Sequence, residues 1–283
     1  MRTRKRVEEQ LFLWAMRLVS WSVIAVFFLV VAVVVLKGFR AVSWEMVTEV
    51  PKGGFYFGKG GGIANAIVGS FYLAFGSLAL AVVIGLPVAL GMNVQLAAHK
   101  SWVSALRYFL DVLWGVPSIV YGAFGFTLMT FFHWRASLLA GIITVSLVIT
   151  PIVIRALDEV LRTIPRGLME TAYSLGATKT ETAFVVFFRQ ALPGFITAML
   201  LAFGRGIGDA AAVLFTAGYT DQIPHSVMEP TATLPLAIFF QLSSPIPEVK
   251  ARAYGATLIL TLLILAISVA SRLSSRKFKN NII

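Results

Sequence analysis

The sequence predicts an all-α, polytopic membrane protein with six transmembrane helices. Its 283 residues are 58% apolar and only 13% charged, and the mean hydropathy is +0.84. Soluble domains are about 45–50% apolar and about 25% charged. The apolar residues also cluster in long uncharged runs, and roughly 20 such residues of helix cross a bilayer core about 30 Å thick. Composition and clustering together exclude a soluble enzyme.

Six apolar runs are long enough to cross a bilayer as helices. In chain order they are Leu18–Leu36, Ile63–Leu90, Leu106–Phe132, Ser137–Ile154, Pro193–Ala217 and Tyr254–Ser271. The first run follows Arg2, Arg4, Lys5 and Arg6, as a signal peptide would. It is too long for a signal peptide, however, and no small-residue cleavage site follows it. We therefore expect a retained membrane anchor.

The basic residues orient these spans. With the N-terminus in the cytoplasm, 16 of the 24 Lys and Arg residues fall inside and seven outside, and Arg205 lies within a span. Because cytoplasmic loops carry the excess of Lys and Arg, both termini are predicted to be cytoplasmic. The expected segments of this multi-pass protein of the cytoplasmic membrane are 1–17 (cytoplasmic), 18–271 (transmembrane domain, with a cytoplasmic loop 155–191 and an outer loop 218–253) and 272–283 (cytoplasmic tail).

Several binding chemistries are excluded. The net charge of +11 could indicate nucleic acid, but the basic residues lie in gaps between apolar runs rather than on one soluble face. There is no cysteine, and three scattered histidines make no metal cluster. Gly53–Gly60 has the spacing of a phosphate-binding loop, yet Gly60 stands where Ser or Thr should hold magnesium. We expect no cofactor, metal or nucleotide in this chain.

The cytoplasmic loop 155–191 shows the pattern of two helices joined by a turn. Pro165 suits the start of the first helix, and Gly176 stands where a helix end needs a residue free to adopt positive φ. Thr178 and Glu181 form a capping-box pattern that opens the second helix, expected to run from Lys179 to about Gln190. Such a helix beneath a membrane domain offers a surface to a partner.

One charged pair lies inside the fifth expected span. Arg205 stands halfway along it, where insertion costs about 2.5–3.5 kcal/mol, and Asp209 follows one turn later. The pair could simply fix helix packing, or Arg205 could bind a tetrahedral oxyanion through its fork of donors. Arg107 and Asp111 have the same spacing at the cytoplasmic mouth of the third span, where a solvated helix-end pair is expected.

In the outer loop, Thr231–Leu242 has apolar residues at helical spacing but is too short to span the membrane. We expect an interfacial or re-entrant helix there.

The cytoplasmic loop resembles the EAA loop of binding-protein-dependent ABC importer permeases. Glu170-Thr-Ala-Tyr-Ser-Leu-Gly176 reproduces the start of that pattern, with Thr171 in place of the first Ala, and Arg189 stands where the family has Pro. In the family this loop docks into a cytoplasmic ATPase. The residues that the resemblance assigns to this coupling are Glu170, Thr171, Ala172, Gly176, Ala177 and Thr178.

A second resemblance narrows the family. Arg205–Gly218 is similar to the R-A-L-G-E-T-A-P-L-L-F-T-A-G pattern of phosphate-importer permeases, with Asp209 for Glu and Ala212 for Pro; Gly115–Gly122 and Gly61–Gly69 are further matches. The resemblance implies a type I, MetI-like permease fold and a substrate path containing Arg205 and Asp209.

The resemblance also implies partners: a second permease subunit, a cytoplasmic ATPase dimer that hydrolyses ATP, an external phosphate-binding protein and membrane lipid, but no nucleic acid. The permease itself would not be an enzyme. The alternatives are a permease for another oxyanion, such as molybdate, sulfate or phosphonate, and an ATPase-independent secondary anion transporter. A secondary transporter usually shows inverted repeats and interrupted helices, and neither is evident in the sequence.

Overall fold

The computed structural model describes residues 2–58 and 60–279, and it is helical, as the sequence predicts. Over these ranges the β-structure is one isolated bridge, between Pro51 and Gly61. The helices are α1 (Arg2–Ala41), α2 (Trp44–Thr48), η1 (Phe55–Phe57), α3 (Ala64–Leu90), η2 (Gly91–Gln95), α4 (Lys100–Gly115), α5 (Ser118–Phe131), α6 (Leu138–Arg162), α7 (Arg166–Ser174), α8 (Lys179–Glu181), η3 (Thr182–Phe187), α9 (Phe188–Ile207), α10 (Leu234–Leu242) and α11 (Pro247–Lys279).

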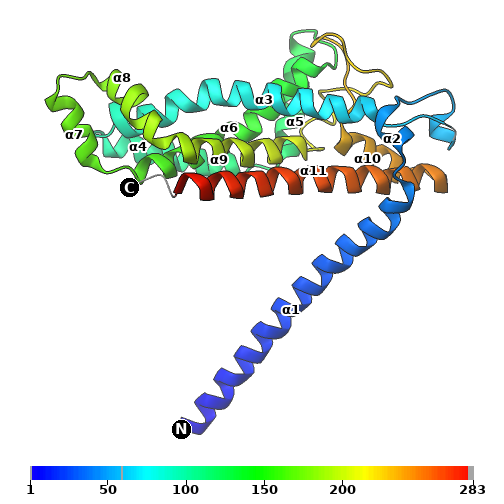
Figure 1. The fold of residues 1–283 in the computed structure, drawn as a ribbon, viewed down its shortest axis with the longest axis horizontal. Helices are drawn as coiled ribbons and strands as arrows, with labels where there is room; N and C mark the ends of the chain where they lie inside the picture. Colours follow the sequence, from blue (N-terminus) through cyan, green and yellow to red (C-terminus); the bar gives the residue numbers. More distant parts are fainter. Residues whose placement is uncertain (1, 59, 280–283) are drawn as a thin grey trace.

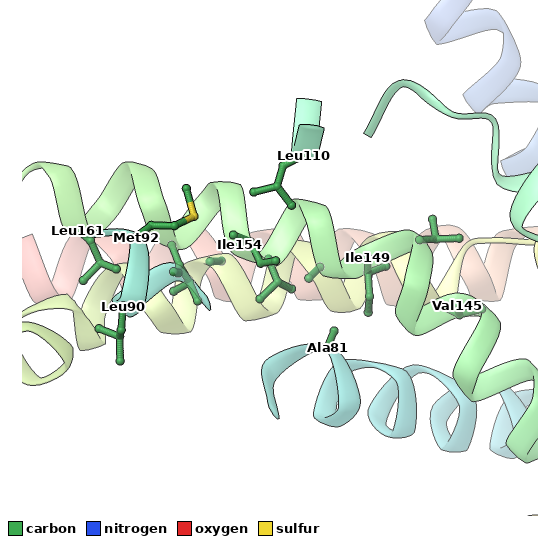
Figure 2. Packing of buried hydrophobic residues seen from close by; sticks show 14 of the residues in the cluster. Ala81, Leu90, Met92, Leu110, Val145, Ile149, Ile154 and Leu161 are labelled. Atoms are coloured by element: carbon green, nitrogen blue, oxygen red, sulfur yellow. The ribbon is translucent and has the colours of Figure 1, made fainter. Parts of the chain in front are cut away.

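Helices α3, α6, α9 and α11 run side by side and form the body of the bundle (Figure 1). Apolar side chains from α3, η2, α4 and α6 meet in its core (Figure 2), including Met92, Leu110, Ile149 and Ile154. Lipid tails are as apolar as leucine, so close packing rather than hydrophobic exclusion holds such helices together. Gly85 serves that packing, since a Cβ there would stand 3.0 Å from Val153 Cγ1.

Helix α1 projects away from this body (Figure 1). It touches the bundle near its C-terminal end, where a Cβ on Gly38 would stand 2.7 Å from the carbonyl oxygen of Tyr254. The ammonium group of Lys37 lies 4.8 Å from the centre of the Tyr254 ring. Within the described residues, five helices are long and apolar enough to cross a membrane, or six if the bent pair α4 and α5 counts as one span. The expectation of a six-span membrane protein is confirmed in this sense.

The third span is not the single helix Leu106–Phe132 that the sequence predicts. Helices α4 and α5 meet at 92° across residues 116 and 117. Pro117 has no N–H to donate and forces the preceding residue into an extended conformation, and Val116 accordingly has φ −70° and ψ 128°. The Tyr121 hydroxyl donates to the carbonyl oxygen of Leu113 at 2.9 Å, which satisfies one acceptor at the break.

The fifth span also differs from the prediction of Pro193–Ala217. Residues Lys179–Ile207 form one continuous helical stretch through α8, η3 and α9, so the second loop helix does not end near Gln190. Pro193 lies inside α9, where neighbouring groups can satisfy the backbone bond that proline removes. The helix then ends at Ile207, ten residues early, at a run of alternating glycines, and residues 208–217 continue as irregular turns.

Three local predictions are confirmed. The Thr178–Glu181 capping box is complete, since the Glu181 N–H donates to Thr178 Oγ1 at 3.2 Å and the Thr178 N–H donates to Glu181 Oε2 at 2.8 Å. Helix α10 forms within Thr231–Leu242, with Thr233 capping it. Gly176 closes α7 with φ +84°.

Candidate functional site

The predicted charged pair lies at the point where α9 ends. Arg205 Nη1 is 2.8 Å from Asp209 Oδ2, and the two side chains are 45% and 2% exposed. Gly206 lies between them in sequence. A Cβ placed on Gly206 would stand 3.6 Å from Ser77 Oγ and 3.9 Å from Ile149 Cδ1. Because Ser77 and Ile149 lie at the middle of α3 and α6, the pair stands halfway along the bundle.

Asp209 also organises the irregular backbone that follows. Its Oδ1 accepts a hydrogen bond from the Ala212 N–H at 2.9 Å. Ala212, Val213 and Ala217 are fully buried in this segment. Non-helical backbone at membrane depth is tolerated where protein buries it or where it lines a water-filled path. The carboxylate therefore serves both the guanidinium and the broken helix end.

The structure brings together two of the segments that carry the family resemblance. Gly122 on α5 faces the turn after α9, and a Cβ there would stand 2.8 Å from the carbonyl oxygen of Ala211. Only a glycine allows this approach, because the contacted atoms belong to the backbone. The Gly115–Gly122 segment therefore positions the irregular segment 208–217, which contains Asp209.

The half-exposed Arg205 has hydrogen-bond donors that Asp209 does not use. A guanidinium carries five N–H donors in a fixed fork, and the contact with Asp209 occupies one edge of it. At mid-bundle depth such a group cannot face lipid without a large cost, so its exposed edge must face a partner protein or a water-filled path. The arrangement can bind an oxyanion, with Asp209 partly neutralising the guanidinium.

The predicted coupling residues lie far from this pair, at the end of the bundle where α7 and α8 are found (Figure 1). Glu170, Thr171, Gly176 and Thr178 are exposed and Ala177 is half-buried. Ala172 is buried, and its side chain faces the protein rather than the open surface. The neighbouring Leu175 is 83% exposed, so this end of the bundle presents an apolar side chain to which a partner could bind.

Gly176 shapes the turn between α7 and α8. Its N–H donates to the Tyr173 carbonyl at 3.0 Å, and the Ala177 N–H donates to the Ala172 carbonyl at 3.0 Å, as in a glycine-capped helix end. A Cβ on Gly176 would meet nothing within 4 Å. The glycine is therefore required for its backbone conformation and not for space.

Gly176→Ala is expected to destabilise this turn by about 1–2 kcal/mol, the cost of a left-handed conformation for an L-residue. We expect weaker binding of an ATPase partner, measured by co-purification, with little change in the melting temperature of the transmembrane bundle. Gly167→Ala is the matched control, because Gly167 lies inside the same helix α7 and also has open space around it. Equal ATPase recovery from the two variants would contradict the role of Gly176.

The sequence interpretation of Arg107 and Asp111 as a pair is wrong. Arg107 donates Nε and Nη2 to Asp158 on α6, each at 2.8 Å. Asp111 instead contacts Arg155 Nε at 2.7 Å. Both residues reach across to α6 because α4 packs against it, and a neighbouring helix at ion-pair distance competes with the i, i+4 partner. Periodicity within one segment carries no signal for such a contact.

Asp158 is the buried centre of this network. Its side chain is fully buried, and it accepts from Asn93 Nδ2 at 2.9 Å and from Arg155 Nη1 at 3.3 Å besides Arg107. Two partly exposed guanidiniums and one amide thus surround a carboxylate with no access to water. The network ties η2, α4 and α6 together near the end of the bundle that carries α7.

The bundle of long apolar helices defines a polytopic membrane protein. Residues 81–280 match the model of the family described as "Binding-protein-dependent transport system inner membrane component". The chain belongs to this family.

Several relatives of the chain are phosphate transport system permease proteins. The PstA protein of Yersinia pestis is 33% identical over 249 residues, covering 87% of this chain and 82% of the relative. The PstA protein of Mycobacterium leprae is 34% identical over 243 residues, covering 84% and 79%. Among solved structures, a chain of the inward-facing MetNI methionine ABC transporter superposes with a TM-score of 0.63 at 20% identity, covering 76% of this chain and 95% of that one. At this identity the likeness shows the fold alone.

Proposed function

We propose that the chain is one of two permease subunits of an ATP-driven, binding-protein-dependent importer of inorganic phosphate. The half-exposed Arg205 beside buried Asp209, at a helix break midway along the bundle, supports this function most directly. The names of the PstA relatives favour phosphate as the cargo. Both termini lie in the cytoplasm in this proposal, in line with the excess of basic residues on that side.

The chemistry of the pair suits phosphate. Arg205 would hold two phosphate oxygens through the free edge of its guanidinium. Asp209 would keep the anion from binding too tightly, and its carboxylate could accept a hydrogen bond from a protonated phosphate oxygen. A fully ionised sulfate has no such proton to donate. The pair thereby favours phosphate over sulfate and molybdate, which are the competing cargoes.

Transport would follow an alternating-access cycle. An external phosphate-binding protein delivers the anion near the outer loop and α10. Binding of ATP draws two ATPase subunits together, and α7 with the Gly176 turn transmits that movement to the spans. The partners are a PstC-like permease, a PstB-like ATPase dimer and a PstS-like binding protein. ATP hydrolysis belongs to the ATPase.

Co-expression with the neighbouring candidate subunits tests this assignment. We expect a second permease and an ATPase to co-purify with this chain, and phosphate with its binding protein to stimulate ATP hydrolysis in proteoliposomes. Sulfate and molybdate should leave the hydrolysis rate at its basal value. Failure to recruit any ATPase would overturn the importer assignment, while stimulation by another oxyanion would replace the cargo.

A further inference from the structure

A concave site, separate from the Arg205–Asp209 pair, lies at the end of the bundle that carries α7. A cavity of about 650 Å³ opens between η2, the start of α4, the end of α6, and residues of α7 and η3. Its volume falls in the range of about 300–1,000 Å³ typical of small-molecule sites. The core residues Met92 and Leu161, which lie close together at one end of the cluster in Figure 2, form part of its wall.

The charged side chains that line this cavity are basic. Lys100, Arg107 and Arg162 line it, and the described residues of its lining include no acidic side chain. Arg107 uses Nε and Nη2 toward Asp158, which leaves a third guanidinium nitrogen. Within the described residues, Lys100 and Arg162 have no ion-pair partner. Asp158 offsets the charge of Arg107, whereas Lys100 and Arg162 leave the cavity with a net positive charge, which favours binding of an anion.

Two neighbouring features suit an anion with several oxygens. Ser104 contributes a hydroxyl to the lining. Lys100 begins α4, a helix of 16 residues whose first turn has no side-chain cap, so free N–H groups of that turn add to the positive potential of the wall. A phosphate group, with its higher charge and extra acceptors, matches such a set of donors better than a single carboxylate.

We propose that this cavity binds a phosphate group, carried either by an anionic phospholipid headgroup or by free inorganic phosphate. Two exposed aromatic residues on α4, Trp102 and Tyr108, are of the kind found at headgroup level and are compatible with the lipid source. The cavity also touches Met169 on α7. A bound phosphate group would therefore brace α4 and α6 against α7, a consequence for coupling that rests on the proposed function.

The test uses the full chain in detergent and two probes. Native mass spectrometry measures binding of dioctanoyl phosphatidylglycerol, with dioctanoyl phosphatidylcholine as the zwitterionic comparison. Equilibrium dialysis measures binding of radiolabelled inorganic phosphate, in an Arg205→Gln background so that the mid-bundle pair does not contribute. The cavity variant is Lys100→Gln with Arg162→Gln. The control is Lys179→Gln with Arg189→Gln, which removes the same charge from exposed positions at the same end of the bundle.

We expect at least about tenfold weaker binding of one probe in the cavity variant, and at most about a twofold change in the control, which reports general charge attraction. Loss of phosphatidylglycerol binding identifies the lipid as the source, and loss of phosphate binding identifies the free ion. Equal effects of the two variants, or no binding of either probe to the starting chain, would overturn the site. If the double variant does not fold, Lys100→Gln alone provides the comparison. None of these outcomes depends on transport, so the test stands apart from that of the proposed function.

Discussion

Arg205→Gln is expected to reduce phosphate uptake by about 100-fold or more in proteoliposomes that contain the assembled importer. Glutamine keeps much of the side-chain length but removes the charge and the planar fork. The loss of two charge-assisted hydrogen bonds, each at least about 1.5 kcal/mol, corresponds to about a hundredfold change. Glutamine can still donate a hydrogen bond to the buried Asp209. Assembly, melting temperature and the basal ATPase rate are measured beside uptake, so that a loss of folding is distinguished from a loss of phosphate binding.

Two further variants separate substrate binding from helix packing. Arg205→Lys keeps the charge but loses the fork, so we expect partial uptake. Arg189→Gln removes a basic residue from the exposed surface of the same helix and should transport normally. Normal uptake by Arg205→Gln, with assembly and ATP hydrolysis shown to be intact, would show that the pair only fixes helix packing.

Asp209 allows a finer test of the cargo. If its carboxylate accepts a proton-bearing phosphate oxygen, Asp209→Asn should narrow the preference of the importer for phosphate over sulfate. The measurement is uptake of phosphate in competition with sulfate. Asp209 also accepts from the Ala212 N–H, a bond that the asparagine oxygen can retain, so the irregular segment should keep its shape.

Local sequence signals predicted the parts of this molecule that are determined locally. Ser137 and Ile63 were expected to open two spans, and they directly precede α6 and α3. The capping box at Thr178 depends on atoms three residues apart. In each case the interacting groups are close in sequence, so the local pattern of residue types is enough to predict the structure.

The breaks in the spans could not be predicted in the same way. Pro117 can break a helix, but the size of the 92° bend depends on how α5 packs against α6 and the turn after α9. The early end of α9 has the same origin. Residues 208–217 are as apolar as a helix would be, and they are irregular because Asp209 and the close approach of Gly122 stabilise another conformation.

Asp158→Ala is expected to lower the free energy of unfolding by about 3 kcal/mol. Beside Arg205→Gln, this substitution has the largest expected effect. Removing one member of a buried ion pair leaves its partner charge uncompensated, which typically costs about 3–5 kcal/mol. The lower value applies here, because Arg107 and Arg155 are each 26% exposed and water can solvate them in part. Thermal unfolding of the purified chain in detergent measures the change as a loss of several degrees in Tm.

Asp111→Ala is the matched control for this effect. It removes the same charge from the same network, but the Asp111 side chain is 48% exposed in its contact with Arg155. Exposed ion pairs contribute about 0–1 kcal/mol, so the melting temperature should fall only slightly. Similar losses in the two variants would show that burial of Asp158 does not determine the stability of the network.

A double variant distinguishes an uncompensated charge from a simple loss of packing. Asp158→Leu combined with Arg107→Met removes both members of the pair and fills the space with apolar side chains, a replacement that is often neutral or stabilising. We expect the double variant to recover most of the stability that Asp158→Leu alone loses, a coupling of at least about 1 kcal/mol between the two sites. Strictly additive losses would contradict the pairing. Arg155 keeps its contact with Asp111 in every variant of this cycle, so the recovery measures the Arg107–Asp158 pair itself.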